Sequence, residues 1–87
     1  MCTYIVEKAA VSGCGKGADG WFNVTSASVA VDHPTHAPYD HALLIDFMNE
    51  AIGPTARVAV ELSPESGRAL IEAIEKALEA GARERAF

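Results

Sequence analysis

Hydrophobic and polar residues follow two different periods along this chain, and the change between them falls near residue 63. Before that point, runs rich in β-branched and aromatic residues show the composition of strands, and several alternate with a period of two. After it, apolar residues recur every three or four positions, which is the period of an amphipathic helix. The pattern predicts strands at 2–12, 21–32, 41–49 and 56–62, followed by a helix at 64–80.

The segment 13–20 contains four glycines and is interpreted as a flexible loop between the first two strands. Its Gly15–Gly20 stretch has the form G-x-G-x-x-G, but a dinucleotide site needs a helix directly afterwards, and a strand follows here. Gly17 also stands where a nucleotide-binding P-loop would have Ser or Thr after its lysine. The segment therefore indicates a hairpin loop and no nucleotide site.

The helix has clear signals at both ends. Ser63 is a good N-cap and Pro64 suits the first helical position, while Gly81 predicts that the helix stops after residue 80.

The element order predicts an α+β fold, with a four-stranded, mostly antiparallel sheet and one C-terminal helix packed on one face. Strand 41–49 is apolar on both sides apart from Asp46, which favours a central strand or one covered by another subunit. We therefore expect a homodimer or a larger homo-oligomer.

Composition and charge narrow the class of protein. The chain has 87 residues, one domain's length, and a net charge of −5 from 12 acidic and 7 basic residues. Without a basic stripe, nucleic acid and anionic membrane surfaces are not expected partners. The sequence shows no secretory signal and no membrane-spanning run, so a cytoplasmic location is expected, with Cys2 and Cys14 as reduced thiols.

The three histidines of the chain, His33, His36 and His41, fall within nine residues as H-x2-H-x4-H. Imidazole is the commonest zinc ligand and also suits copper, iron and nickel. Asp32 and Asp40 flank the cluster, and either could orient an imidazole or bind the ion directly. The pattern predicts a transition-metal site, zinc by default, that could support a hydrolytic or hydration reaction. The plainer interpretation is a polar loop whose side chains cap strand ends.

Other candidate chemistry is weaker. Asp46 in an apolar strand could act as an acid or base, and Cys2 could act as a nucleophile beside a free amine. A small pocket beside Trp21 and Phe47 could hold an organic molecule, such as a metabolite or biosynthetic intermediate. This supports two alternatives to the metal hypothesis, a metal-free small-molecule-binding module and an oligomeric accessory protein.

Three segments together resemble a known family: MCTYIVEK at 1–8, GADGWF at 17–22 and DHPTHAPYDHAL at 32–43. The family consists of short bacterial proteins, common in actinobacteria, that are catalogued as a domain of unknown function, DUF6295. The resemblance implies a stand-alone cytoplasmic protein of bacterial type. It implies no activity and no residue roles, so the metal hypothesis rests on the residues of this chain.

Overall fold

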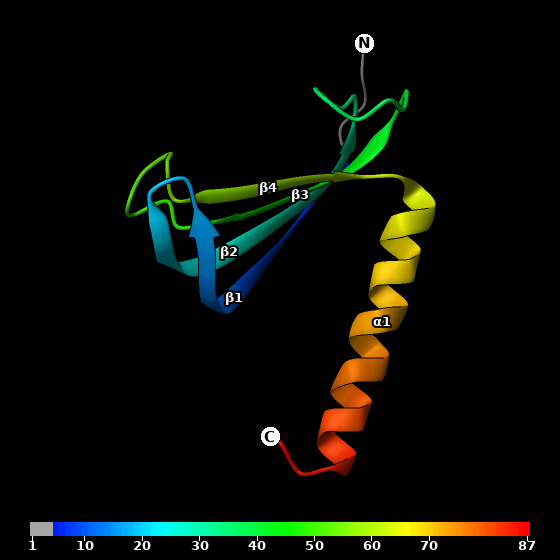
Figure 1. The fold of residues 1–87 in the computed structure, drawn as a ribbon. Helices are drawn as coiled ribbons and strands as arrows, with labels where there is room; N and C mark the ends of the chain where they lie inside the picture. The colour runs from blue at the N-terminus through cyan, green and yellow to red at the C-terminus, as the bar shows by residue number, and fades with distance from the viewer. Residues whose placement is uncertain (1–4) are drawn as a thin grey trace.

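The computed structural model describes residues 5–87. Four strands, β1 (Ile5–Gly17), β2 (Gly20–Asp32), β3 (Ala42–Met48) and β4 (Arg57–Leu62), are followed by one helix, α1 (Pro64–Arg83). The strands form a single antiparallel sheet in the order β1-β2-β3-β4, so that β3 is a central strand (Figure 1). The predicted α+β class, the antiparallel meander and the C-terminal helix are confirmed.

The two faces of the sheet differ in polarity, because successive side chains of a strand point to opposite faces. The strand register places on one face, here called the apolar face, Ala27, Val29, Val31, Leu43, Ile45, Phe47, Val58, Val60 and Leu62. The opposite side, here called the polar face, carries Ser26, Ser28, Leu44, Asp46, Met48, Arg57, Ala59 and Glu61. The alternation predicted for β4 is confirmed, with Arg57 and Glu61 opposite to its valines.

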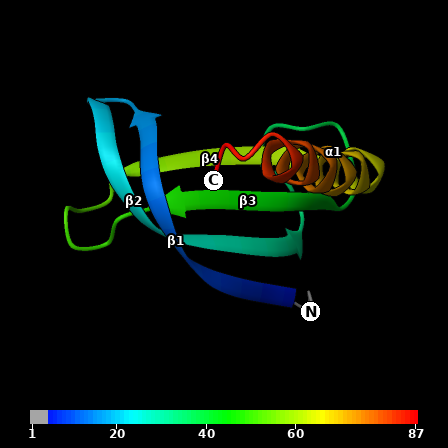
Figure 2. The same ribbon diagram turned by 90° about the horizontal axis from the view of Figure 1, so that it is seen from below.

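The glycine-rich segment is not a long loop. β1 continues to Gly17, which pairs with Gly20, and only a two-residue turn is left between the strands. A bulge precedes this extension, since Val11 and Ser12 together face one residue of β2. Beyond the bulge the hairpin bends over the apolar face (Figure 2). A Cβ at Gly15 would lie 3.1 Å from the side chain of Val24, closer than an ordinary contact, so glycine eases the packing of β1 beside Val24.

The helix begins where the sequence predicts. The Ser63 side chain accepts a hydrogen bond of 3.1 Å from the backbone N–H of Ser66, which is the N-cap interaction. The predicted end was wrong, because α1 runs through Gly81 to Arg83. Arg85 adopts the left-handed conformation (φ 57°), and the N–H of Ala86 donates to the Gly81 carbonyl at 2.9 Å. The left-handed position that usually favours glycine is thus occupied by an arginine.

The predicted packing of the helix on the sheet holds only for its first turns. Gly67 is the only buried residue of α1, and a Cβ there would lie 2.5 Å from a methyl carbon of Leu43. The rest of the helix projects away from the sheet (Figures 1 and 2). Only Ser63 separates β4 from α1, so the helix starts at the end of the sheet and leaves the apolar face largely uncovered. Within residues 5–87, no helix has both the length and the apolar character needed to cross a membrane.

Candidate metal centre and adjoining groove

The loop between β2 and β3 carries all three histidines, and a carboxylate of β4 holds it in place. The Glu61 carboxylate accepts hydrogen bonds from the backbone N–H groups of Thr35, His36 and Ala37 at 2.8 to 2.9 Å. The hydroxyl of Thr35 donates a further bond of 2.9 Å to the same carboxylate. Consecutive N–H groups that converge on one anion fix the backbone of the loop over the polar face.

These donors change the acidity of Glu61. The pKa of Glu61 is lowered to about 2 by the hydrogen bonds that it accepts. The largest contributions come from the N–H groups of Thr35 and Ala37, followed by the N–H group of His36 and the Thr35 hydroxyl. The cause is the preference of N–H donors for the charged form of the carboxylate. Glu61 therefore stays ionised at neutral pH, and the loop retains its anchor there.

An open groove of about 660 Å³ lies between this loop and the polar face. His33, Thr35, His36 and Ala37 line one side, and β3 and β4 supply the remainder, which includes Leu44, Asp46, Arg57, Ala59 and Glu61. The Nε of Arg57 donates to Asp46 Oδ1 at 2.7 Å. This pair explains the carboxylate in an otherwise apolar strand, because a cation on the diagonal neighbour compensates it. The groove therefore combines apolar walls with both signs of charge.

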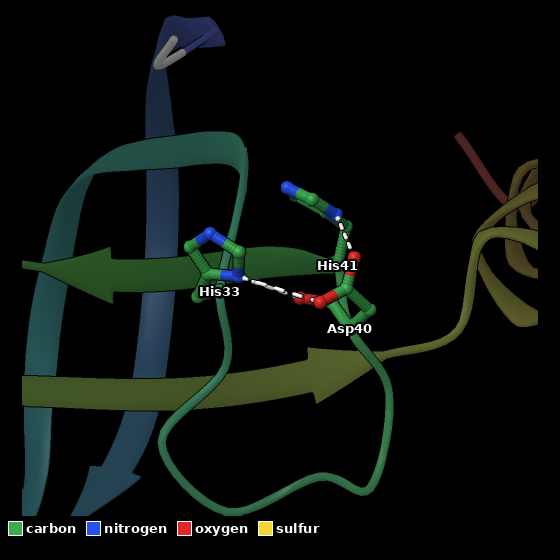
Figure 3. A group of neighbouring side chains, drawn as sticks. All are labelled: His33, Asp40 and His41. Atoms are coloured by element: carbon green, nitrogen blue, oxygen red, sulfur yellow. Dashed lines mark hydrogen bonds and ion pairs between the residues drawn. The ribbon is translucent and has the colours of Figure 1, made fainter. Parts of the chain in front are cut away.

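The strand pairing brings His33 and His41 together. Asp32, the last residue of β2, pairs with Ala42, the first residue of β3. His33 and His41, which are next to them in the chain, therefore stand opposite each other where the loop begins and ends. The two imidazole rings lie with their centroids 4.3 Å apart and are tilted by 36°. Both side chains are close to Asp40 (Figure 3).

The carboxylate of Asp40 and the imidazoles of His33 and His41 together form a possible set of metal ligands. The Nδ1 of His41 lies 2.9 Å from Asp40 Oδ2, and the Nδ1 of His33 lies 4.0 Å from Oδ1. His33 Nδ1 also forms a 2.8 Å hydrogen bond with the backbone carbonyl of Asp40. One candidate ligand atom from each of the three residues can be chosen so that all lie within 4.8 Å of one another. All three residues are exposed, so water and solutes reach them freely.

The other predicted site residues lie elsewhere. His36 does not belong to this group, and its Nδ1 lies 2.9 Å from the hydroxyl of Thr35. Asp32 accepts a 2.7 Å hydrogen bond from the backbone N–H of His33, which caps the start of the loop. Cys2 lies outside the residues that the structure describes.

The pocket expected beside Trp21 and Phe47 is not formed as predicted. Trp21 lines a hollow next to the turn at 50–55, whereas Phe47 lines another under the bent hairpin. Sequence reasoning also missed Glu61 and the pairing of Arg57 with Asp46. Arg57 and Glu61 lie in the strand predicted at 56–62, but nothing in the sequence relates Glu61 to a loop 24 to 26 residues away.

The fold and the site define a small α+β protein with an antiparallel four-stranded sheet and an exposed cluster of two histidines and one aspartate. The chain belongs to DUF6295, a family of unknown function, whose sequence profile matches residues 1–87. No curated protein and no solved structure matches it. The family assignment thus confirms the resemblance carried by the sequence.

Proposed function

We propose that this protein binds a divalent transition-metal ion, zinc by default, through His33, Asp40 and His41. The observation that carries the proposal is the convergence of one ligand atom from each residue within 4.8 Å. Ligand atoms about 2.0 Å from a tetrahedral zinc ion are about 3.3 Å apart. Small rotations of exposed side chains are enough to reach that spacing. Asp40 is then a ligand itself, where the sequence alone left a choice between binding and orienting.

The same site supports a chemical step. Two imidazoles and one carboxylate leave a divalent ion with a net charge of about one plus and with positions for water. Water bound to such an ion loses a proton more readily than bulk water, so a hydrolytic or hydration reaction is the proposed chemistry. His33 also lines the groove, where a substrate could be held between the loop and the polar face. Two histidines with one carboxylate also suit iron, and copper and nickel accept the same donors.

The test is elemental analysis and zinc titration of protein prepared without a histidine tag. The protein is expressed in the cytoplasm, which is the location expected from the sequence. His41→Ala is expected to weaken zinc binding at least about tenfold, because it removes one of three ligands. His36→Ala is the matched control, since His36 is on the same loop but outside the cluster. Binding is also expected to weaken below about pH 6, because protonated imidazole competes with the metal.

Several outcomes would contradict this assignment. Less than about a tenth of an equivalent of any metal, with no uptake on titration, would rule out a metal site, since a resident ion is expected near one equivalent. Loss of binding in His36→Ala would restore the set of three histidines predicted from the sequence. Full binding by Asp40→Asn would reduce Asp40 to an orienting role.

A metal-free binding module is the second candidate, and the groove favours it. Its volume of about 660 Å³ falls within the range of small-molecule sites, and Arg57 and Asp46 offer a donor and an acceptor on its floor. A thermal-shift screen separates the two functions, because a ligand that binds the native state raises the melting temperature. Stabilisation by organic acids but by no divalent metal would favour the module, and no response to either would favour an accessory role.

A further inference from the structure

The helix α1 carries an apolar stripe that residues 5–87 leave largely uncovered. The large side chains of this stripe recur at helical spacing and are 42 to 57% exposed, namely Leu70, Ile71, Ile74 and Leu78. Gly67 belongs to the same side of the helix, one turn earlier, and it contacts Leu43 of the apolar face. The stripe therefore faces the space between the helix and the apolar face of the sheet.

The apolar face is also incompletely covered. Ile5 is 55% exposed, and Val31 and Phe47 are each 37% exposed. Two apolar hollows lie near its ends, one of about 310 Å³ under the bent hairpin and one of about 270 Å³ where the helix meets the sheet. Ile71 and Val31 both line the second hollow, which joins the stripe and the face into one concave surface.

The core within one chain is small. In the described part of the chain, the buried hydrophobic residues are Val24, Ala27, Ala42 and Ala56, and no large side chain is fully buried. Hydrophobic burial is the main stabilising contribution to a fold, and these four residues provide little of it. In an α+β fold, the residues of the stripe and of the apolar face would normally pack together as the core. Here they are left partly exposed.

The chain exposes more surface than a compact monomer of its mass, and the excess has the size of a permanent interface. The chain exposes 6647 Å², whereas a compact monomer of 9.2 kDa is expected to expose about 4,900 Å². The excess is about 1,700 Å² per copy, and obligate homodimers bury roughly 1,000 to 2,500 Å² on each partner. The radius of gyration, 14.6 Å, likewise exceeds the roughly 12 Å expected for a compact domain of this length.

We propose that a second copy of this chain covers the concave surface, with the α1 stripe of each copy packed on the apolar face of the other. Each copy provides both a helix stripe and the concave surface that receives the stripe of the other copy. One twofold axis therefore forms both contacts at once and closes the assembly as a dimer. A 20-residue helix is about 30 Å long, which is enough to cross the four strands. The exchange supplies each sheet with the helix layer that its own chain does not provide.

Analytical ultracentrifugation with a metal chelator present tests the assembly independently of the metal site. The wild-type protein is expected to sediment at twice the mass of 9.2 kDa at low micromolar concentration. Ile74→Asp is expected to raise the dimer dissociation constant at least about 30-fold, because the dimer would bury an unpaired carboxylate. Ala69→Asp adds the same side chain to the other side of the helix and is expected to leave the constant within about threefold.

A second measurement keeps the proposal testable if Ile74→Asp does not fold. In a wild-type dimer made from one isotope-labelled and one unlabelled copy, contacts between copies are expected to link Ile74 to Val31 or Phe47. Contacts that link Ile74 mainly to its own counterpart would overturn the helix-on-sheet arrangement. A wild-type monomer at high micromolar concentration would overturn the dimer, as would equal dissociation constants for the Ile74 and Ala69 variants.

Discussion

The loop over the polar face and the helix beside the apolar face differ in how far one chain meets their needs. The loop has its hydrogen-bond partners within the chain, whereas the helix leaves its apolar side chains exposed. Glu61 accepts four hydrogen bonds from the loop, and each of them comes from the same molecule. The α1 stripe lies against the sheet at Gly67, but its large side chains stay about half exposed. A single chain thus determines the conformation of its loop, whereas we expect the stability of its fold to depend on a second copy. Stability of that kind rises with protein concentration.

The largest expected effect comes from a charge on the apolar face. Phe47→Asp is expected to destabilise the protein by about 3 kcal/mol or more, because the proposed dimer would bury the carboxylate. Ser26→Asp adds the same charge to the polar face and is expected to cost less than about 1 kcal/mol. Urea unfolding at several protein concentrations measures both variants. Similar losses for the two, independent of concentration, would remove the distinction between the faces.

The second effect concerns the loop anchor. Glu61→Gln replaces a charged acceptor of four bonds with an amide that has one oxygen acceptor, so several loop donors lose their partner. Hydrogen exchange of the Thr35, His36 and Ala37 amides is expected to accelerate by about tenfold. Glu75→Gln, an exposed change on α1, serves as the control and is expected to leave these amides unchanged. Unaltered exchange in the Glu61 variant would show that the loop does not need the carboxylate.

The pH dependence of the loop sharpens the same point. Because the folded structure lowers the pKa of Glu61 from 4.5 to about 2, the anchor stabilises the fold fully above pH 4.5. That stabilisation diminishes as the pH falls below 4.5 and is lost once it passes through 2. The chemical shift of the Glu61 side-chain carboxyl carbon should therefore be constant from pH 7 to about pH 5 and titrate only at lower pH. A midpoint at the value of an ordinary glutamate would contradict the anchor.

Local signals predicted most of the fold and only part of the site. Alternation located β4, and the Ser63-Pro64 pair located the start of α1, because both signals depend on neighbouring residues. Two features could not be predicted in this way. The path of the histidine loop depends on Glu61 of another strand, so sequence spacing could not separate His36 from the other two histidines. The end of α1 depends on Arg85, a residue that rarely adopts a left-handed conformation.

The smallest expected effect distinguishes the two glycines at the ends of the helix. Alanine is favoured over glycine within a helix by about 1 kcal/mol, so each Gly→Ala change begins with the same gain. At Gly81 the new methyl would meet the ring of Phe87, which is 83% exposed and free to turn aside. Gly81→Ala is therefore expected to stabilise the protein by up to about 1 kcal/mol.

At Gly67 the same methyl would meet Leu43 of β3, the strand against which the first turns of the helix lie. The clash is expected to offset the gain, so that Gly67→Ala destabilises the protein by about 1 kcal/mol. Thermal unfolding of the two variants, at one protein concentration, measures the difference. If both alanines stabilised the protein equally, the first turns of α1 would not be seated on the sheet, and the angle that the second copy is proposed to fill would not be fixed.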